Sequence, residues 1–211
     1  DSTQLLLSFA TGYASGFGIL VVMRNILALL GCLPGGGKST VRNILAEQLG
    51  WKMFSTGDYM RGLAKERGMT FDEFNAHIAN HKQDDELIDA ELERIEQEEN
   101  NIIVDSHLAF HFVPSGFKVF FDISLEASAE RIFNDRDRDT RKSVGDVMDT
   151  LEEAKARIQA RIDNHNDRYM RHYGLTPYDS SQYDLVINTE KNTAGEIAER
   201  IIAEFKTWRT V

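Results

Sequence analysis

The sequence is poor in cysteine, proline and long apolar runs. Its single cysteine, Cys32, excludes an internal disulfide and is typical of a protein from a reducing compartment such as the cytoplasm. The three prolines are scattered, and neither a repeat nor a low-complexity linker interrupts the 211 residues. We therefore expect one domain that is long enough to bury a core without disulfides.

Positive charge is also scarce, because 34 Asp and Glu residues outnumber 24 Lys and Arg residues and leave a formal net charge of −10. This balance argues against general binding to nucleic acid or to an anionic membrane surface. An anionic ligand would therefore need a local cluster of cations within this acidic chain. The composition does not identify a protein partner.

The first 22 residues give no sign of a targeting segment. They begin with an acid and contain no Lys or Arg, unlike the basic start of a secretory signal. The apolar run at 17–23 ends at Arg24, far short of the roughly 20 residues of a transmembrane helix. Since Met23 can serve as a start, we expect residues 1–22 to be a poorly ordered leader or extension. Residues 23–211 are then expected to form the domain.

Short apolar runs alternate with longer helical patterns along this domain. The predicted strands are 26–30, 52–55, 101–105, 118–121 and 184–188. The predicted helices are 38–49, 58–67, 70–80, 84–99, 125–134, 145–172 and 193–208. This alternation predicts an α/β fold with a five-stranded parallel sheet, helices on both faces and ligands at the carboxyl ends of the strands. We expect the acid-rich segment 84–99 to be only a solvated helix face.

The segment after the first predicted strand has a phosphate-binding signature. It reads C-L-P-G-G-G-K-S-T over residues 32–40 and runs directly into a helix, with Cys32 where the usual first glycine lies. Three consecutive glycines let backbone N–H groups turn inward around a phosphate, which also faces the positive end of the helix dipole. In this pattern Lys38 reaches the β- and γ-phosphates, and the Ser39 hydroxyl ligates Mg²⁺. The residues expected to bind ATP are Pro34, Gly35, Gly36, Gly37, Lys38, Ser39 and Thr40.

Further candidates lie where the second and third predicted strands end. An acid beside the phosphate loop can hold Mg²⁺, usually through water, and Asp105 at the end of the third strand is that candidate. After the second strand, S-T-G-D-Y-M-R at 55–61 places Arg61 one helical turn past a capping Asp58. A guanidinium there can make bidentate contacts with phosphate oxygens. The other interpretation is a capping Asp58 beside a solvated Arg61.

These motifs resemble the nucleoside monophosphate kinase family of P-loop proteins, in which a segment of the form S-T-G-D-x-x-R holds the acceptor nucleotide. The resemblance covers about residues 23–205. L-A-K-E-R-G-M-T-F-D-E-F at 63–74 and Y-D-L-V-I-N-T at 183–189 are similar to the archaeal-type cytidylate kinases in particular. The resemblance implies an acceptor-binding helical insert at about 56–99, a closing lid at about 135–145, and an acceptor bound by Thr56, Gly57 and Arg61.

His107 is a departure from this family. The resembled kinases commonly have an arginine two residues after the acid that ends the third strand, whereas this chain has a histidine. A neutral imidazole offers one donor and no fixed charge. Two interpretations stay open, namely that His107 contacts the acceptor or that it is a local structural histidine. The pairs His77/His81 and His107/His111 are spaced for a helix face but lack the further ligands of a transition-metal site.

Arginines are concentrated between residues 131 and 171, which contain eight of the fifteen in the chain. A helical turn of about 100° per residue brings Arg157, Arg161 and Arg168 within roughly 40° of one another, beside an apolar stripe. Cations placed in advance suit phosphoryl transfer, because negative charge spreads over the transferred group. By their positions in the resembled family, the catalytic candidates besides Lys38 are Arg131, Arg136, Arg161 and Arg168.

The sequence therefore predicts a kinase that transfers the γ-phosphoryl group of ATP to a nucleoside monophosphate, with CMP or dCMP favoured, and that uses Mg²⁺. One alternative is another P-loop kinase, either adenylate-kinase-like or acting on a different small molecule; a hydroxyl acceptor would leave segment 55–61 unexplained. The other alternative is a nucleotide-binding switch without catalysis. Cys32 and His107 favour the switch, whereas Lys38, Ser39 and Arg61 argue against it.

Overall fold

A computed structural model describes residues 25–30, 33–78, 82–134 and 150–210. The predicted leader at 1–22, the predicted lid at 135–145 and Cys32 lie outside these ranges. The strands are β1 (Ile26–Leu30), β2 (Lys52–Ser55), β3 (Ile102–Asp105), β4 (Phe117–Asp122) and β5 (Leu185–Asn188). The helices are α1 (Lys38–Leu49), α2 (Thr56–Glu66), α3 (Phe71–Ile78), α4 (Lys82–Glu98), α5 (Ala109–Phe112), α6 (Leu125–Asn134), α8 (Leu151–Tyr173) and α9 (Ala194–Trp208), with a 3-10 turn η1 (Ser180–Gln182).

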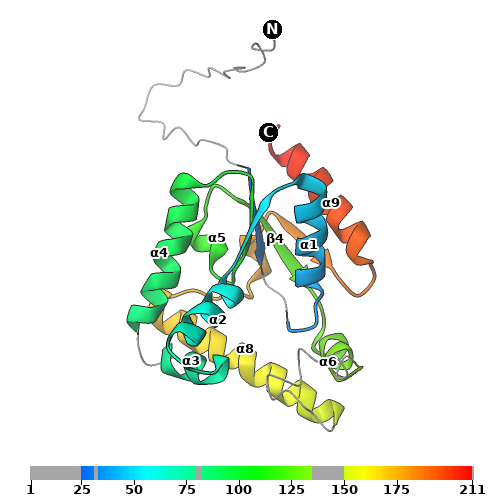
Figure 1. Ribbon diagram of the computed structural model, residues 1–211. Coiled ribbons are helices and arrows are strands. Elements are labelled where there is room, and N and C mark those ends of the chain that lie inside the picture. Colours follow the sequence, from blue (N-terminus) through cyan, green and yellow to red (C-terminus); the bar gives the residue numbers. More distant parts are fainter. Residues whose placement is uncertain (1–24, 31–32, 79–81, 135–149, 211) are drawn as a thin grey trace.

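The alternating side chains of β1 explain why the sheet is covered on both sides. Ile26 and Ala28 belong to one apolar cluster, Leu27 and Leu29 belong to another, and all four are fully buried. Helices α2, α3, α4, α5 and α8 pack on the first cluster, and α1 and α9 pack on the second (Figure 1). The prediction of a five-stranded parallel sheet with helices on both faces is confirmed.

Most predicted elements agree with the structure to within two residues at each end. For α8, the predicted start at residue 145 lies outside the described residues. The described helix begins after Thr150. The Thr150 hydroxyl caps the helix by accepting a hydrogen bond from the Glu153 N–H. The short elements α5 and η1 were not predicted, because four and three residues are too few to show a period. Among the described helices, none has both the length and the apolar character required to cross a membrane.

The sheet register brings the ends of three strands into one row. The strand order is β2-β3-β1-β4-β5, so β3 lies between β2 and β1. Asp105 at the end of β3 pairs with Leu29 of β1 on one side and with Ser55 of β2 on the other. The loop that follows β1 and the helix that follows β2 therefore meet at Asp105.

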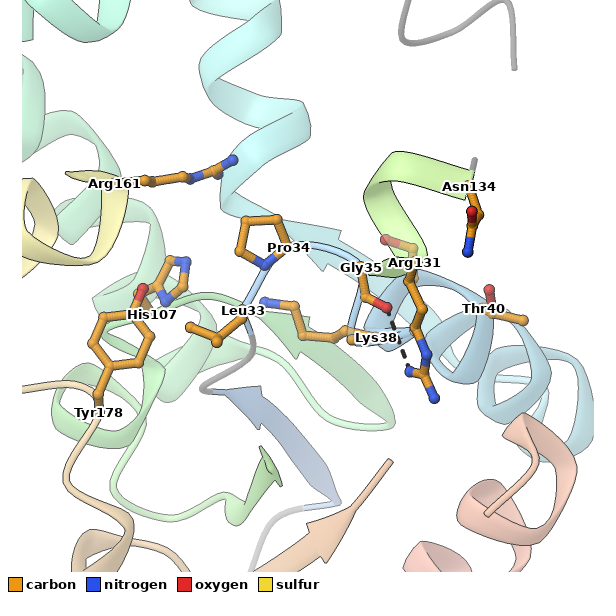
Figure 2. A pocket seen from close by; sticks show the side chains of 13 residues that line it. Leu33, Pro34, Gly35, Lys38, Thr40, His107, Arg131, Asn134, Arg161 and Tyr178 are labelled. Atoms are coloured by element: carbon orange, nitrogen blue, oxygen red, sulfur yellow. Dashed lines mark hydrogen bonds between the residues drawn. The ribbon is translucent and has the colours of Figure 1, made fainter. Parts of the chain in front are cut away.

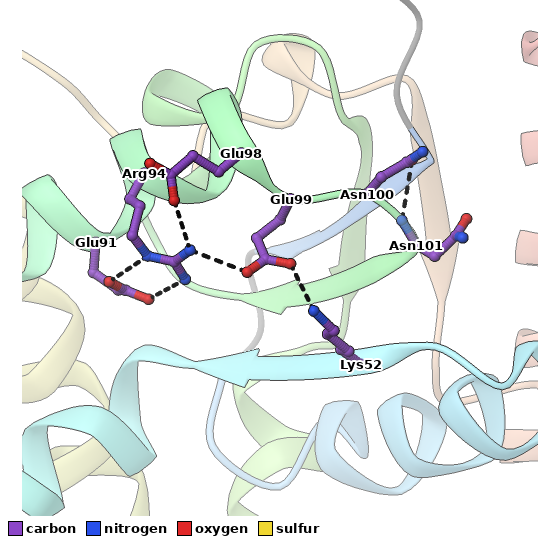
Figure 3. A network of polar contacts seen from close by, with 7 residues as sticks. All are labelled: Lys52, Glu91, Arg94, Glu98, Glu99, Asn100 and Asn101. Carbon is purple, nitrogen blue, oxygen red and sulfur yellow. Dashed lines mark hydrogen bonds and ion pairs between the residues drawn. The ribbon is translucent and has the colours of Figure 1, made fainter.

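A network of charged side chains joins the end of α4 to strand β2 (Figure 3). Arg94 donates hydrogen bonds to Glu91, Glu98 and Glu99. Lys52 Nζ on β2 lies 3.1 Å from Glu99 Oε2. Hydrogen bonds from Arg94 and then from Lys52 hold the pKa of Glu99 below its ordinary value. Arg94 is 40% exposed and Lys52 is 72% exposed, and ion pairs of such accessible side chains contribute little to stability. We therefore expect the buried apolar face of α4 to contribute more than this network.

The buried face of α4 generates a stability prediction. Leu92 is fully buried, whereas Leu87 on the same helix is 44% exposed. We expect Leu92→Ala to lower the free energy of unfolding by about 2–5 kcal/mol, because it removes buried methyl groups and leaves a cavity. The matched control, Leu87→Ala, should lower it by less than about 1 kcal/mol. Urea denaturation followed by circular dichroism measures both changes, and equal losses would contradict this packing.

Candidate active site

The loop between β1 and α1 has the backbone of a phosphate cradle. Gly35 and Gly37 have φ angles of 82° and 80°, left-handed values that glycine adopts at little cost. A Cβ on Gly35 would also lie 3.1 Å from both the Ile132 side chain and the Ser128 carbonyl oxygen of α6. Gly37 immediately precedes α1 and supplies no side-chain cap. The first N–H groups of α1 are therefore left for an anion.

Two cavities open on this loop and adjoin each other. The larger, of about 680 Å³, is lined by residues 33–40 and by His107, Arg131, Asn134, Arg161 and Tyr178 (Figure 2). The smaller, of about 230 Å³, lies between α2, the end of β3 and α8, and its lining includes Thr56, Gly57, Arg61, Asp105 and Arg168. Four residues line both cavities: Lys38, Ser39, His107 and Arg161. They mark the place where the contents of the two cavities would meet.

Asp105 contacts two cations at the edge of the loop. Lys38 Nζ lies 2.7 Å from Asp105 Oδ1, and Arg42 Nη1 lies 3.3 Å from Asp105 Oδ2. The lysine predicted to hold the donor phosphates and the acid predicted to hold Mg²⁺ are thus in direct contact. Arg42 was missed from the sequence. The spacing was the signal that could have identified it. Arg42 follows Lys38 by four residues, so both side chains lie on the same face of α1, one turn apart.

Asp58 lies between two guanidinium groups on the α2 side. Its Oδ2 is 3.4 Å from Arg42 Nη1, and its Oδ1 accepts a hydrogen bond from Arg61 Nη2. Burial alone would raise the pKa of Asp58, but the hydrogen bond from Arg61 and the charges of both arginines hold the pKa below its ordinary value. The guanidinium of Arg61 also lies 5.4 Å from the centre of the Phe71 ring.

The prediction that Asp58 caps this helix is wrong. Helix α2 begins at Thr56, and its cap is Ser55, whose hydroxyl accepts from the Asp58 N–H at 3.4 Å. The carboxylate of Asp58 is thereby free to bind the two arginines. Arg61 is a half-exposed side chain that pairs with Asp58, so it is not simply solvated.

Two acids of α4 point inward, which corrects the expectation that segment 84–99 is only a solvated helix face. Asp85 is 2% exposed, and both of its carboxylate oxygens accept hydrogen bonds from Arg168 of α8. One turn later, Asp89 accepts a hydrogen bond of 2.8 Å from the Tyr173 hydroxyl. The sequence pattern could not show these contacts, because their partners follow 83 and 84 residues later. The Asp85 contact holds Arg168 in place at the smaller cavity.

The predicted arginines have different surroundings. Arg131 of α6 donates to the Gly35 carbonyl at 3.5 Å, as drawn in Figure 2, and to the Thr189 carbonyl at 2.7 Å. Arg161 of α8 lines both cavities. The structure thus brings three of the four predicted arginines, Arg131, Arg161 and Arg168, around the two cavities. The fourth, Arg136, lies outside the described residues.

His107 belongs to a cluster of rings beside the shared wall of the cavities. The His107 ring centre lies 4.9 Å from that of His165 and 5.9 Å from that of Tyr178. His165 Nδ1 lies 3.1 Å from the Tyr178 hydroxyl oxygen. His107 Nδ1 is buried and has no hydrogen-bond partner among the described residues. His165 and Tyr178 were not predicted, because no motif includes them.

Both histidines of this cluster are neutral near pH 7. Burial, followed by the nearby charge of Lys38, lowers the pKa of His107 well below its ordinary value. Burial, followed by the charge of Arg161, lowers the pKa of His165 to about 3. The imidazoles can therefore take part in hydrogen bonds at this site without adding positive charge to the cations around them.

Comparisons with known proteins agree with this geometry. A family model described as an AAA domain matches residues 32–155. The cytidylate kinase of Sulfurisphaera tokodaii is 32% identical over 172 residues, which cover 81% of this chain and 89% of that protein. Shikimate kinase from Bacteroides thetaiotaomicron is a solved structure with a TM-score of 0.58 at 16% identity, covering 89% of this chain and 99% of that one. At that identity the likeness concerns the fold alone.

A longer protein contains a similar segment. The S-adenosylmethionine-dependent nucleotide dehydratase of Lacinutrix mariniflava is 32% identical over 185 residues, which cover 87% of this chain but 36% of that protein. The chain therefore spans little more than a third of the length of this relative.

Asp89 generates a prediction about pH. Burial, together with the charge of Asp85, raises the pKa of Asp89 to about 6 despite the hydrogen bond from Tyr173. The unfolded value is about 3.9, so the folded protein holds this proton more tightly than the unfolded chain. The contribution of Asp89 to stability should therefore fall as pH rises from about 4 to about 6.

The variant Asp89→Asn tests this, because it removes the titration and keeps an acceptor oxygen for Tyr173. Relative to the unmodified protein, the variant should become progressively more stable between pH 4 and pH 7. Urea denaturation at each pH measures the difference. Stability curves that stay parallel across this window would contradict the raised pKa.

Proposed function

The chain belongs to the P-loop kinase family that includes the archaeal cytidylate kinases, and we propose that it phosphorylates a nucleoside monophosphate, with CMP or dCMP favoured. Membership in this family implies that the chain binds ATP. The observation that carries the proposal is the pair of adjoining cavities with a shared cationic wall. The larger suits a triphosphate on the glycine loop, and the smaller suits a phosphate-bearing acceptor, so the two phosphate groups would meet end to end.

On the donor side, the backbone N–H groups of residues 35–40 would surround the phosphates, and Lys38 would exchange Asp105 for the β- and γ-phosphates. Pro34 and Thr40 complete the lining of this cavity. Arg131 and Arg161 would supply positive charge to the group in transfer.

On the acceptor side, the insert at 56–99 would hold the nucleoside monophosphate. Thr56 and Gly57 line the smaller cavity at the start of α2, and Arg61 one turn later would bind the acceptor phosphate. Arg168, held by Asp85, would contribute a second guanidinium from α8. Both arginines come from helices that pack on the same face of the sheet.

Mg²⁺ fits the residues at this site. The Ser39 hydroxyl and the Asp105 carboxylate both line the smaller cavity, and Mg²⁺ prefers such oxygen ligands. In the part of the chain that the structure describes, no group of three or more His, Cys, Asp or Glu side chains could enclose a metal ion. We propose that substrate phosphates and water would hold the ion, and that Ser39 and Asp105 would add ligands. When bound, the ion would neutralise charge on the triphosphate.

The reaction needs no general base from the protein. The acceptor phosphate oxygen is already largely ionised near neutral pH, so it can attack the γ-phosphorus directly. As the new P–O bond forms, the bond from the γ-phosphorus to the β–γ bridging oxygen breaks, and its electron pair leaves with ADP. Positioning of the two phosphates and the pre-placed cations would therefore determine the rate.

His107 is proposed to contact the acceptor. It lines both cavities, and its Nδ1 is buried without a partner in the described residues. Buried polar atoms normally have a hydrogen-bond partner, which a substrate phosphate would supply here. Because the ring is neutral, this contact would be weaker than that of the arginine common at this position in the family.

An acceptor panel with ATP and Mg²⁺ tests the proposed reaction. We expect ADP to form with CMP or dCMP and to exceed the ADP formed with AMP, GMP or UMP. Lys38→Ala should lower this turnover by roughly a hundredfold or more, because it removes charge that faces the transferred group. Lys206→Ala on the exposed face of α9 is the control and should keep full turnover. Phosphorylation of AMP but not CMP would overturn the acceptor, and ATP binding without turnover would indicate a nucleotide-binding switch.

The role of His107 is tested by separating KM from kcat. We expect His107→Leu to raise the acceptor KM by roughly tenfold or more, because a hydrogen bond to a charged group contributes about 1.5–3 kcal/mol. His107→Asn retains a donor and should lose less. His111→Leu, exposed on α5, is the matched control and should leave the KM unchanged. If His107→Leu also leaves it unchanged, His107 is a structural histidine.

A further inference from the structure

Five side chains of alternating charge follow one another from the lysine that both cavities share, and four of the five line the smaller cavity. They follow one another in the order Lys38, Asp105, Arg42, Asp58 and Arg61, and we call them the charge line. The successive contacts are 2.7 Å from Lys38 to Asp105, 3.3 Å from Asp105 to Arg42 and 3.4 Å from Arg42 to Asp58, followed by the Asp58–Arg61 pair. The line begins at the proposed donor lysine and ends at the proposed acceptor arginine.

Arg42 joins the two halves of the charge line. The same nitrogen, Nη1, faces Asp105 at 3.3 Å and Asp58 at 3.4 Å. Both distances exceed the usual 2.7–3.2 Å of an N–H···O hydrogen bond, so neither carboxylate holds Arg42 firmly. The side chain is 14% exposed, and its Nε is buried without a partner in the described ranges. Arg42 can therefore shift toward either acid without first breaking a strong hydrogen bond.

Each acid has a second cation that the proposed reaction would recruit. Donor phosphates compete with Asp105 for Lys38, and the acceptor phosphate competes with Asp58 for Arg61. Asp105 is only 8% exposed, and a buried carboxylate that loses its cation is costly. The release of Lys38 is therefore easier if a replacement cation already lies beside Asp105. The Asp58 side chain is 58% exposed, so water can also solvate it, and Arg42 at Asp58 mainly weakens the attraction between Asp58 and Arg61.

We infer that Arg42 is a positioning residue for both nucleotides, a shared counter-ion that replaces Lys38 at Asp105 or Arg61 at Asp58 when a phosphate draws that cation away. This role rests on the proposed function, since it assumes a phosphate-bearing ligand on each side. It adds a residue from α1 to the acceptor site, although α1 otherwise serves the donor. Without Arg42, Asp58 would hold Arg61 alone, and Asp105 would hold Lys38 alone.

Isothermal titration calorimetry with CMP and with a non-hydrolysable ATP analogue tests this role. The analogue is titrated without divalent metal, so that no added ion replaces Lys38 at Asp105. We expect Arg42→Gln to raise the Kd of each ligand by roughly fivefold, as for the loss of a partly buried ion pair. Arg200→Gln, exposed on α9, is the control and should bind both ligands like the unmodified protein.

Rescue separates this role from direct contact with the acceptor. Adding Asp58→Asn to Arg42→Gln removes the hold on Arg61, so the Kd for CMP should return to within about twofold of the original value. The Kd for the ATP analogue should stay raised, because Asp105 still holds Lys38. A loss of CMP affinity that Asp58→Asn does not rescue would overturn the inference and indicate that Arg42 touches the acceptor.

Circular dichroism and thermal melting establish that each variant is folded. If Arg42→Gln does not fold, Arg42→Lys takes its place, since it keeps the charge but cannot present the planar guanidinium to two acids. Its expected increase in Kd is smaller than that of Arg42→Gln, and adding Asp58→Asn should return the Kd for CMP, but not that for the ATP analogue, to the value of the unmodified protein. Unchanged affinity for both ligands in a folded variant would overturn the inference.

The proposed function fails separately, if the unmodified protein binds none of CMP, dCMP or AMP. In that case the ATP analogue still tests the link between Arg42 and Lys38. Its Kd in the Arg42 variant, compared with that in the unmodified protein, does not depend on an acceptor. An increase would support the link from Arg42 to Lys38, and no change would remove it.

Discussion

The contact of Lys38 and Arg42 with the carboxylate of Asp105 is the interaction on which the rest of the site depends. A carboxylate that is 8% exposed is unfavourable unless cations neutralise it, and these two do so at 2.7 and 3.3 Å. The sheet register places Asp105 between the strand that leads to the glycine loop and the strand that leads to α2. The same carboxylate therefore holds Lys38 at the glycine loop and is linked through Arg42 to Asp58 at the start of α2.

A net charge of −10 and a cationic site are compatible because acids accompany the cations. Asp105 pairs with Lys38, Asp58 pairs with Arg61, and Asp85 on α4 pairs with Arg168. In the ligand-free protein these pairs limit the electrostatic cost of bringing guanidinium and ammonium groups together. A phosphate would then exchange partners with the acids rather than meet bare cations, so the acids help to set the affinity of the site.

The elements were predictable from the sequence where a local pattern was long or well marked. Helix α1 follows a glycine loop and ends before Gly50, whose left-handed conformation closes it, and its predicted bounds are those of the structure. Four-residue α5 offered no period. Strand order was also not predictable, because the insertion of β3 between β1 and β2 depends on how the helices pack on both faces of the sheet.

The sequence by itself determined the glycine loop and the segment at 55–61, because their donors and charges are neighbours along the chain and act through local backbone geometry. Only the tertiary structure decided which acids and cations meet. Arg42 reaches Asp105 across 63 residues, and Arg168 reaches Asp85 across 83. The inward orientation of Asp85 also depends on tertiary contacts, because the helical pattern of its own segment did not show it. The sequence around a cation does not indicate which distant acid it will contact. The sheet register and the contacts between α4 and α8 decide this, because they bring particular partners within hydrogen-bond distance.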